Sequence, residues 1–391
     1  MKKIKEKQNI PEGWSQVLLG DIVSVTTGKR DANHGSEDGV FPFFTCAQKV
    51  SKIDDYSFDK EAVLVAGNGD FNVKYYKGKF DAYQRTYVLS DFRNTTGHFV
   101  YHKVKQALNH IMRNNQGSSV KFIKMGDLTN YEFLFPPIQE QQKIAEILGV
   151  VDEDIAKTRG VIDATEKLKR GLMQKLFTRG IGHTKFKKTK LGEIPEGWEI
   201  GSVEDLLVSI VGGGTPSRKE SKYWGGNIPW MTVKDMSNKK YIYDAEEYIT
   251  EKGLKESSAN LISENSIITS TRMGIGRVYI SKIPIAINQD LKGLILKDDF
   301  VLDYVYWMLS SLARKFEAKG SGSTVKGIRL EEYKSVEIVL TRNKTEQQKI
   351  AEILSTVDEK ISVNKKLLAK LTKLKKGLMQ DLLSGGVRVK V

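Results

Sequence analysis

The chain contains 391 residues, and about 150 residues per domain predicts two or three domains, each with its own core. Lys and Arg number 62 and Asp and Glu 48, so the formal net charge is +14. This excess favours a polyanionic partner, although a basic surface that is merely solvated would also explain it. The single cysteine, Cys46, excludes an internal disulfide and a cysteine-rich metal site.

No targeting segment is apparent. The N-terminal stretch 1–7 is charged, and no apolar run of signal-peptide length follows it. No other stretch approaches the roughly 18 apolar residues of a membrane span. We therefore expect a cytoplasmic protein with no membrane partner.

Two sequence motifs occur twice in the chain. Ile10–Trp14 returns as Ile194–Trp198, and Glu140–Leu148 returns unchanged as Glu346–Leu354. From residue 140 to residue 180, 22 of 41 positions are identical to their counterparts 206 positions later. The chain is therefore a tandem duplication, with a similar start and a similar tail in each copy and a divergent middle.

The two tails have apolar residues mostly three or four positions apart, which predicts long helices over residues 139–177 and 345–383. The first seam comprises Ile144, Leu148, Val151, Ile155, Ile162, Leu168, Leu172 and Leu176, and the second Ile350, Leu354, Val357, Ile361, Leu368, Leu371, Leu374, Leu378 and Leu382. A lone apolar stripe is not stable in water, so we expect the helices to pair as an antiparallel intramolecular coiled coil. An intermolecular coiled coil remains the alternative.

One polar residue interrupts each seam, Thr158 in the first helix and Asn364 in the second, at equivalent positions. These two residues could meet at the centre of an antiparallel pair and fix its register, or they could simply be tolerated there.

Each middle contains short β-type runs and one helix, which predicts an α+β protein with two mixed α/β domains in tandem. The expected strands are 17–25, 40–45, 62–66, 73–76, 86–89 and 120–123 in the first middle and 228–233, 266–271, 277–280 and 293–296 in the second, with helices at 99–112 and 302–316. The expected segments are a first domain over 1–138, a helix over 139–180, a second domain over 181–344, a helix over 345–384 and a tail over 385–391.

Polar and basic residues gather in the loops between these strands, and their side chains are of the types that hydrogen-bond base edges and phosphates. The candidates are Lys29, Arg30, Asn68, Asn72, Lys74, Gln84 and Arg85 in the first middle and Thr215, Ser217, Arg218, Lys219, Lys234, Thr271, Arg272, Arg277, Asn288 and Gln289 in the second. For any single residue, ordinary solvated loop chemistry is the competing interpretation.

We find no catalytic constellation. No GxxxxGK[ST] phosphate-binding loop is present, and the one Pro-Pro pair, Pro136-Pro137, has the wrong neighbours for an amino-methyltransferase loop. His98 and His102 have helical i, i+4 spacing but lack a third ligand, so they indicate a polar helix face and no metal site. We predict no catalytic residue, no metal and no cofactor in this chain.

Two basic units with divergent middles and two near-identical helical tails resemble the specificity subunit of Type I restriction-modification enzymes. The motifs that carry the resemblance are Ile-Pro-Glu-Gly-Trp at 10 and 194, Glu-Gln-Gln-Lys-Ile-Ala-Glu-Ile-Leu at 140 and 346, and Gly-Leu-Met-Gln at 171 and 377. The looser stretch Gly213-Gly214-Thr215-Pro216-Ser217 has no counterpart in the first copy, where Thr26-Thr27-Gly28-Lys29 stands.

The resemblance implies that each middle is a target-recognition domain that reads one half of a bipartite double-stranded DNA site. It also implies that the helices set the spacing and dock two modification subunits, with two restriction subunits as possible further partners. S-adenosylmethionine, ATP and Mg would then act in the partners. Candidate docking residues are Gln141, Lys143, Glu146, Gln347, Lys349 and Glu352. A coiled-coil protein scaffold and a self-contained DNA-modifying enzyme are the alternatives.

Overall fold

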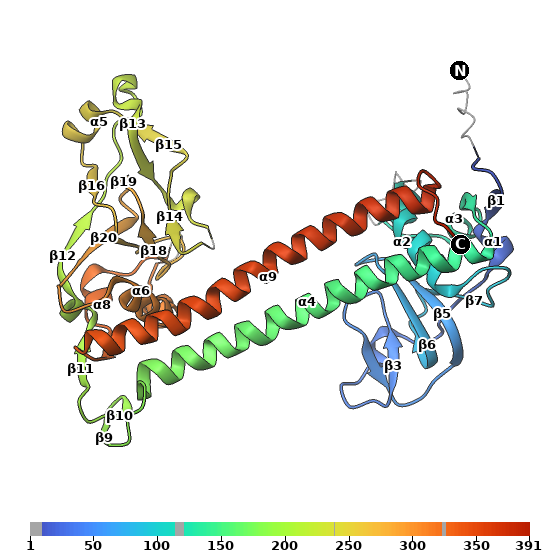
Figure 1. Cartoon of the computed structure of the whole chain (residues 1–391), viewed down its shortest axis with the longest axis horizontal. Coiled ribbons are helices and arrows are strands. Elements are labelled where there is room, and N and C mark those ends of the chain that lie inside the picture. Colours follow the sequence, from blue (N-terminus) through green and yellow to red (C-terminus); the bar gives the residue numbers. More distant parts are fainter. Residues whose placement is uncertain (1–9, 114–120, 238, 323–325) are drawn as a thin grey trace. The chain divides into compact units, whose positions relative to one another are not determined.

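The computed structural model describes residues 10–113, 121–237, 239–322 and 326–391 (Figure 1). The chain groups into two compact units, unit 1 from residues 1–161 and 364–391 and unit 2 from residues 162–363. Two long helices, α4 (Ile138–Arg179) and α9 (Lys344–Ser384), confirm the predicted helical tails. Each unit therefore combines one globular region with part of both helices.

Unit 1 is built on a six-stranded sheet with the order β2-β7-β5-β6-β3-β4, in which only β3 and β6 run parallel. Its elements are β1 (Ser15–Leu18), α1 (Leu19–Ile22), β2 (Ser24–Thr27), β3 (Phe41–Phe44), β4 (Ser51–Ile53), β5 (Phe58–Ala66), β6 (Val73–Ala82), β7 (Thr86–Ser90), α2 (Gly97–Arg113), α3 (Met125–Thr129) and β8 (Glu132–Phe135). Val63, Val65 and Leu89 face α2 and the main core, whereas Leu64, Phe80 and Val88 form a second cluster. The alternation along β5 explains these two apolar faces.

Two predictions for unit 1 need correction. The expected strand 17–25 is interrupted by the short helix α1, because Leu19 and Ile22 are both buried there. The expected strand 120–123 begins at Val120, outside the described residues, and the rest of it contributes only an isolated bridge between Phe122 and Asn68.

Unit 2 contains a five-stranded sheet with the order β12-β20-β17-β18-β14 and a four-stranded sheet with the order β15-β13-β19-β16. Its elements are β9 (Phe186–Thr189), β10 (Gly192–Pro195), β11 (Glu199–Ser202), β12 (Leu207–Gly212), β13 (Trp224–Met231), β14 (Tyr241–Ile242), β15 (Glu247–Ile249), α5 (Glu251–Lys255), β16 (Asn260–Ile262), β17 (Ile267–Ser270), β18 (Val278–Ser281), β19 (Ile285–Ile287), β20 (Leu291–Leu296), α6 (Leu302–Ser311), α7 (Ala313–Lys319), α8 (Leu330–Lys334) and β21 (Glu337–Leu340). The helix expected over 302–316 is two helices, α6 and α7, that meet at buried Leu312.

The two sheets share a frame that the divergent sequences conceal. The order β2-β7-β5-β6-β3 in unit 1 matches β12-β20-β17-β18-β14 in unit 2, with the same antiparallel and parallel pairings. Residues 213–266, between β12 and β17, number 54, whereas residues 28–57, between β2 and β5, number 30. Most of the extra length of the second copy therefore lies in that segment, which includes β13, β15 and β16.

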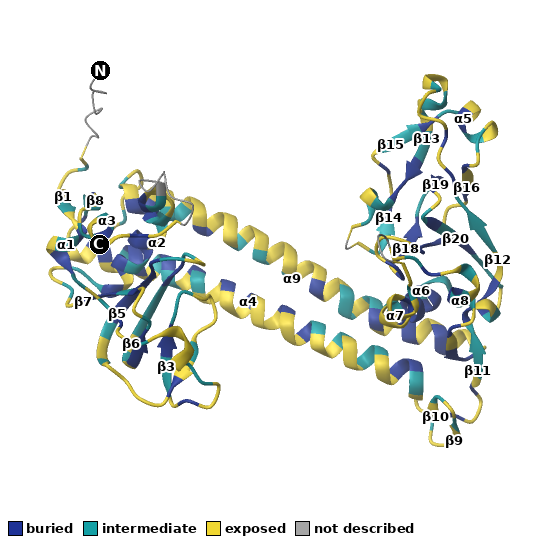
Figure 2. Ribbon diagram, turned by 180° about the vertical axis from the view of Figure 1, so that it is seen from behind, coloured by how far each residue is buried: buried dark blue, intermediate teal, exposed yellow. Residues whose placement is uncertain are grey.

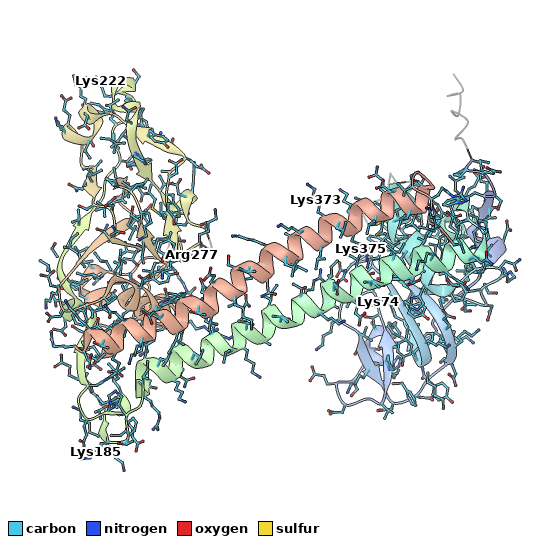
Figure 3. All side chains as sticks on the ribbon, in the orientation of Figure 1. Lys74, Lys185, Lys222, Arg277, Lys373 and Lys375 are labelled. Carbon is cyan, nitrogen blue, oxygen red and sulfur yellow. The ribbon has the colours of Figure 1, made fainter. Side chains whose placement is uncertain are left out.

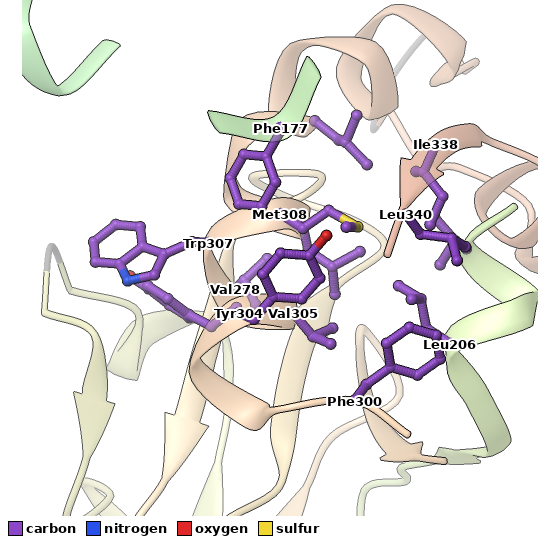
Figure 4. Close-up of a cluster of buried hydrophobic side chains, with 14 of the residues drawn as sticks. Phe177, Leu206, Val278, Phe300, Tyr304, Val305, Trp307, Met308, Ile338 and Leu340 are labelled. Carbon is purple, nitrogen blue, oxygen red and sulfur yellow. The ribbon is translucent and has the colours of Figure 1, made fainter. Parts of the chain in front are cut away.

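The two long helices pack antiparallel within each unit. In unit 1 the start of α4 shares a core with the end of α9 through Ile144, Leu148 and Leu382, and Lys375 pairs with Asp152. In unit 2 the end of α4 shares a core with the start of α9, and Lys169 lies 2.6 Å from Asp358. Phe177 of α4 belongs to the same core as side chains of α6 and β21 (Figure 4). These pairings confirm the intramolecular interpretation.

The predicted seam is wrong at two positions. Leu168 is 54% exposed and Leu374 is 51% exposed. The positions two turns earlier, Val161 and Leu367, are 41% and 44% exposed. The two helices thus have partly exposed apolar residues at equivalent positions, among the many exposed residues along both helices (Figure 2).

A tryptophan and a glutamate from the repeated motifs bond to each other in both units. In unit 1, the Trp14 indole N–H donates to Glu140 over 2.8 Å, and in unit 2 Trp198 donates to Glu346 over 3.0 Å. All four residues are buried. Each bond ties the start of a globular region to the first turn of the helix that follows it.

Each buried glutamate also binds a basic residue that follows the other long helix. Arg388, beyond α9, donates to both oxygens of Glu140 over 2.8 and 2.9 Å. His183, beyond α4, lies 2.7 Å from Glu346. We call each set of Trp, Glu and basic residue a junction; it joins a globular region, the start of one long helix and the chain after the other.

Glycine is required where each long helix ends at its junction. Gly385 has φ +74° and Gly180 has φ +60°, a region that favours glycine. A Cβ atom on Gly385 would lie 2.6 Å from Pro11, and one on Gly180 would lie 2.8 Å from Trp198. The helix ends can therefore approach the tryptophans only with glycine at these positions.

The charge of Glu140 depends on its partners. Burial raises the pKa of its carboxyl, but hydrogen bonds from Arg388 and Trp14 outweigh burial and hold the pKa below its ordinary value of 4.5. Because the folded pKa is depressed, the junction stabilises the fold above the ordinary pKa. This stabilisation is lost as the pH falls through the folded pKa.

We predict that Glu140→Ala lowers the free energy of unfolding by about 2 kcal/mol, because it leaves a buried indole N–H unpaired and removes the partner of Arg388. The matched control is Glu146→Ala, at an exposed position on the same helix, which should change it by less than about 0.5 kcal/mol. Urea unfolding followed by circular dichroism measures both. Equal midpoints for the two variants would contradict a structural role for the junction.

Candidate nucleic-acid interface

In unit 1 the candidate residues lie around one end of the six-stranded sheet. Arg30 follows β2, Asn68 follows β5, and Gln84 and Arg85 precede β7. The Gln84 amide donates to the Arg30 carbonyl over 2.9 Å, and the Gly67 amide donates to the Arg85 carbonyl over 2.8 Å. The structure therefore brings these loop residues together, and we call this end of the sheet the unit 1 face.

Two of the unit 1 candidates are supporting residues. Asn72 is buried, and its amide nitrogen donates to the Cys46 carbonyl over 2.8 Å. The Lys74 ammonium (Figure 3) donates to the Ala47 carbonyl over 2.7 Å and also to Asn72. Burial lowers the pKa of Lys74, although Cys46 and Asp70 oppose the change. Both side chains join the loop after β3 to the start of β6.

The other unit 1 candidates are more accessible. Lys29, Gln84 and Arg85 are exposed. Arg30 forms ion pairs with Asp55 and Asp81, with nitrogen-to-oxygen distances of 3.2 and 3.3 Å, and its side chain is partly exposed. Exposed cationic and amide groups therefore lie beside a buried network that holds the loops in place.

In unit 2 one group of candidates forms the corresponding unit 2 face. The Thr215 hydroxyl donates to Gln289 over 2.6 Å, and the Thr271 amide donates to the Asp290 carbonyl over 3.0 Å. Asp290 also accepts from Asn288 over 3.3 Å and lies 3.6 Å from Arg272. Thr271 and Asn288 are buried and act as supports, whereas Gln289 and Arg272 are exposed.

Of the remaining unit 2 candidates, four form a second group around Arg218, and Arg277 lies in a separate turn. Arg218 binds both oxygens of Glu247 over 2.8 and 2.6 Å and lies 3.7 Å above the Trp224 ring, so its guanidinium stabilises the loop after β12. Hydrogen bonding by Arg218 lowers the pKa of Glu247, and the charge of Lys234 contributes. Ser217 and Lys219, on either side of Arg218 in the sequence, are exposed, and so is Lys234. Arg277 (Figure 3) is exposed in the turn before β18.

Sequence reasoning missed three contributors to these faces. Cys46 donates its thiol hydrogen to Asn68 over 3.0 Å, and Asp290 holds Arg272 and Asn288. The loops before α3 and α8 also reach the faces, because Phe122 forms an isolated β-bridge with Asn68 and Gly327 forms one with Arg272. No local sequence signal reveals these long-range contacts, but Asn288 accepts from the Asp290 amide over 3.1 Å, an Asx turn of the kind that asparagine favours.

The predicted docking residues differ in accessibility. Gln141 is buried and donates to the Pro136 carbonyl over 2.8 Å, and Gln347 is buried and donates to the Thr341 carbonyl over 2.8 Å. These two side chains therefore complete the starts of α4 and α9 and are not available to a partner. The remaining candidates, which lie at the surface or close to it, are Lys143, Glu146, Lys349 and Glu352.

The two predicted register residues, Thr158 and Asn364, lie within α4 and α9. Thr158 is buried, and its hydroxyl donates to the Asp154 carbonyl of its own helix over 2.7 Å. Its meeting with Asn364 stays a prediction.

Neither a metal centre nor a membrane segment is found in the described parts of the chain. Among these residues, no group of three His, Cys, Asp or Glu side chains could hold a metal ion. His98 stacks on Tyr75, and His102 is buried, which corrects the expected polar helix face. Burial lowers the pKa of His102 to about 3, so its ring is neutral. No described helix is both long enough and apolar enough to span a bilayer.

Comparison with known proteins now identifies the family. Residues 11–166 and 195–373 match the Type I restriction modification DNA specificity domain. The chain belongs to this family. It is 30% identical over 358 residues to a putative type I restriction enzyme MjaX specificity subunit of Methanocaldococcus jannaschii, an alignment that covers 90% of this chain and 79% of that protein.

Other specificity subunits match over shorter stretches. The EcoDI specificity subunit of Escherichia coli is 38% identical over 169 residues, which cover 43% of this chain and 38% of that protein. The MjaIX specificity subunit of M. jannaschii is 38% identical over 187 residues and is covered over 43% of its length. The chain thus spans about two fifths of these two relatives in the alignments.

The fold is shared with a solved specificity subunit. The crystal structure of the Type-I restriction-modification system S subunit from M. genitalium matches with a TM-score of 0.68 and 17% sequence identity, over 97% of this chain and 98% of that one. The tandem arrangement and the long helices therefore belong to an established fold.

Proposed function

We propose that this chain is the DNA-recognition subunit of a Type I restriction-modification complex and that its two faces each read one half of a bipartite site. The observation that carries the proposal is the shared sheet frame, which presents exposed polar residues at one sheet end in both units. Family membership and the +14 charge support it. Family membership supports the non-catalytic role.

The catalytic chemistry belongs to partner subunits in this proposal. The partners are two adenine methyltransferase subunits that use S-adenosylmethionine, with up to two restriction subunits that use ATP and Mg²⁺. The identical segments Glu140–Leu148 and Glu346–Leu354 favour two copies of one modification partner. Leu168 and its counterpart Leu374, each about half exposed, support two equivalent docking surfaces.

Specific DNA binding should require both faces, because two linked half-sites gain affinity from effective concentration. Each unit contains part of both helices, so deletion of one half would damage the other, and substitution is the cleaner test. We expect Gln84→Ala with Arg85→Ala, or Gln289→Ala with Arg272→Ala, to weaken specific binding at least about tenfold. Fluorescence anisotropy with duplex DNA selected by the wild-type chain measures the loss.

Salt separates this proposal from the scaffold alternative. Release of counterions should lower affinity at least about a hundredfold between about 50 and about 200 mM salt. A flat salt response would favour a protein scaffold, and methylation by the chain alone would favour a self-contained enzyme.

Charge reversal should remove the modification partners one at a time. We expect Lys143→Glu and Lys349→Glu each to leave a complex with one modification subunit, because each alters one of two equivalent surfaces, and the double variant to leave none. Light scattering of the purified complex gives the stoichiometry. Selected DNA sequences should stay the same, and altered base preference would place these residues in the reader instead.

The helices should also set the number of unspecified bases between half-sites. Four residues added after Thr165 and four after Leu371 lengthen each helix by about 6 Å, close to about 2 base pairs. The mapped methylation sites should then show a longer gap with the same specified bases. An unchanged gap in a folded, active variant would refute the role of the helices as spacers.

A further inference from the structure

The shared frame allows the two faces to be compared residue by residue. Val65 pairs with Val73 and Tyr87, and Thr269 pairs with Val278 and Lys292, so Val65 and Thr269 occupy equivalent positions. Three residues further on, beyond the central strand of each sheet, lie Asn68 and Arg272. These two residues are therefore counterparts.

The backbone around both residues is held in the same way. The amide before Asn68, from Gly67, donates to Arg85, and the amide of Thr271 donates to Asp290. On the opposite side, the Ile123 amide donates to the Gly67 carbonyl over 2.7 Å. The Ile328 amide donates to the Thr271 carbonyl over 2.9 Å in the same manner. A side chain at this position is therefore presented by a fixed backbone.

Each side chain is also oriented by a neighbour of its own. The Cys46 thiol donates to the side-chain oxygen of Asn68, Oδ1, over 3.0 Å, which fixes the plane of the side-chain amide. The Asp290 carboxylate lies 3.6 Å from the guanidinium of Arg272, and the Arg272 side chain is about half exposed. Gly327 makes room for it, because a Cβ there would lie 3.3 Å from the Arg272 side chain.

Two neighbouring pairs of equivalent positions do not distinguish the two faces in this way. Gln84 and Gln289 stand at the same place, two residues before β7 and β20, and are the same residue type. Arg85 corresponds to Asp290, which is turned toward Asn288 and Arg272 and is only 14% exposed. At the position of Asn68 and Arg272, by contrast, both side chains are oriented and their chemistry differs.

We propose that Asn68 and Arg272 are the counterpart base-reading residues of the two faces, Asn68 for adenine and Arg272 for guanine. This inference rests on the proposed DNA-recognition function. Asparagine matches the N6 donor and N7 acceptor of adenine, and arginine matches the O6 and N7 acceptors of guanine. One half-site therefore requires adenine at the position where the other requires guanine.

The test compares the bases selected by the full chain and its variants from fully randomised duplex DNA. In Arg272→Asn, the enrichment of guanine at one position of one half-site should fall about 5-fold or more, with the other half-site unchanged. In Asn68→Arg, the enrichment of adenine at one position of the other half-site should fall by a similar factor. The control Arg314→Asn removes an exposed charge from α7 and should keep every base preference.

The outcomes separate the inference from the function on which it rests. Wild-type chain that enriches no sequence would overturn the proposed function. Wild-type chain that enriches a bipartite site, together with variants that keep its bases, would overturn only the base-reading roles. A uniform fall in affinity with unchanged bases would also overturn them, because it would identify phosphate contacts. Thermal unfolding of each variant near the wild-type midpoint confirms that the chain is folded.

Discussion

The junction between a buried tryptophan and a buried glutamate organises the whole chain. Trp14 and Glu140 lie 126 positions apart in the sequence, yet a 2.8 Å hydrogen bond joins them, and Trp198 with Glu346 repeats the arrangement. A buried carboxylate is costly unless it is paired, and Arg388 and His183 provide the pairing partners. The two most similar motifs of the duplication are thus two sides of one contact.

This contact separates the constant part of each unit from the variable part. The junctions, the starts of α4 and α9, and the strand order are alike in both units, although the middles share little sequence. Backbone hydrogen bonds maintain the frame without demanding particular side chains, so exposed positions at the sheet end can change freely. A fold of this kind can acquire a new recognition surface while it keeps its helical connections.

The sequence predicts the helices well and the faces only in part. The three- and four-residue spacing locates α4 and α9 to within one or two residues at each end, because a long amphipathic period is a strong local signal. The same spacing cannot show how wide the buried stripe is, and Leu168 and Leu374 are therefore misplaced in the seam. Residue type locates the polar loops, but Asn72 and Lys74 turn inward because the neighbouring loop at Cys46 and Ala47 offers carbonyl acceptors.

The two junctions also make each unit depend on both copies of the duplication. Unit 1 needs the end of α9 and Arg388 to cover Trp14 and to neutralise Glu140. In unit 2 the end of α4 lies against Trp198, and the His183 ring lies 2.7 Å from Glu346. Neither copy supplies these groups to itself, because each tail helix leaves its own unit before it ends. Each junction is therefore closed by the other copy of the duplication: a single copy has a face and a helix, but it lacks the helix end that closes its junction. Gly180 and Gly385 support this view. Each lies where a helix end comes close to the tryptophan of the unit that it enters, and a Cβ atom there would be too close to neighbouring atoms.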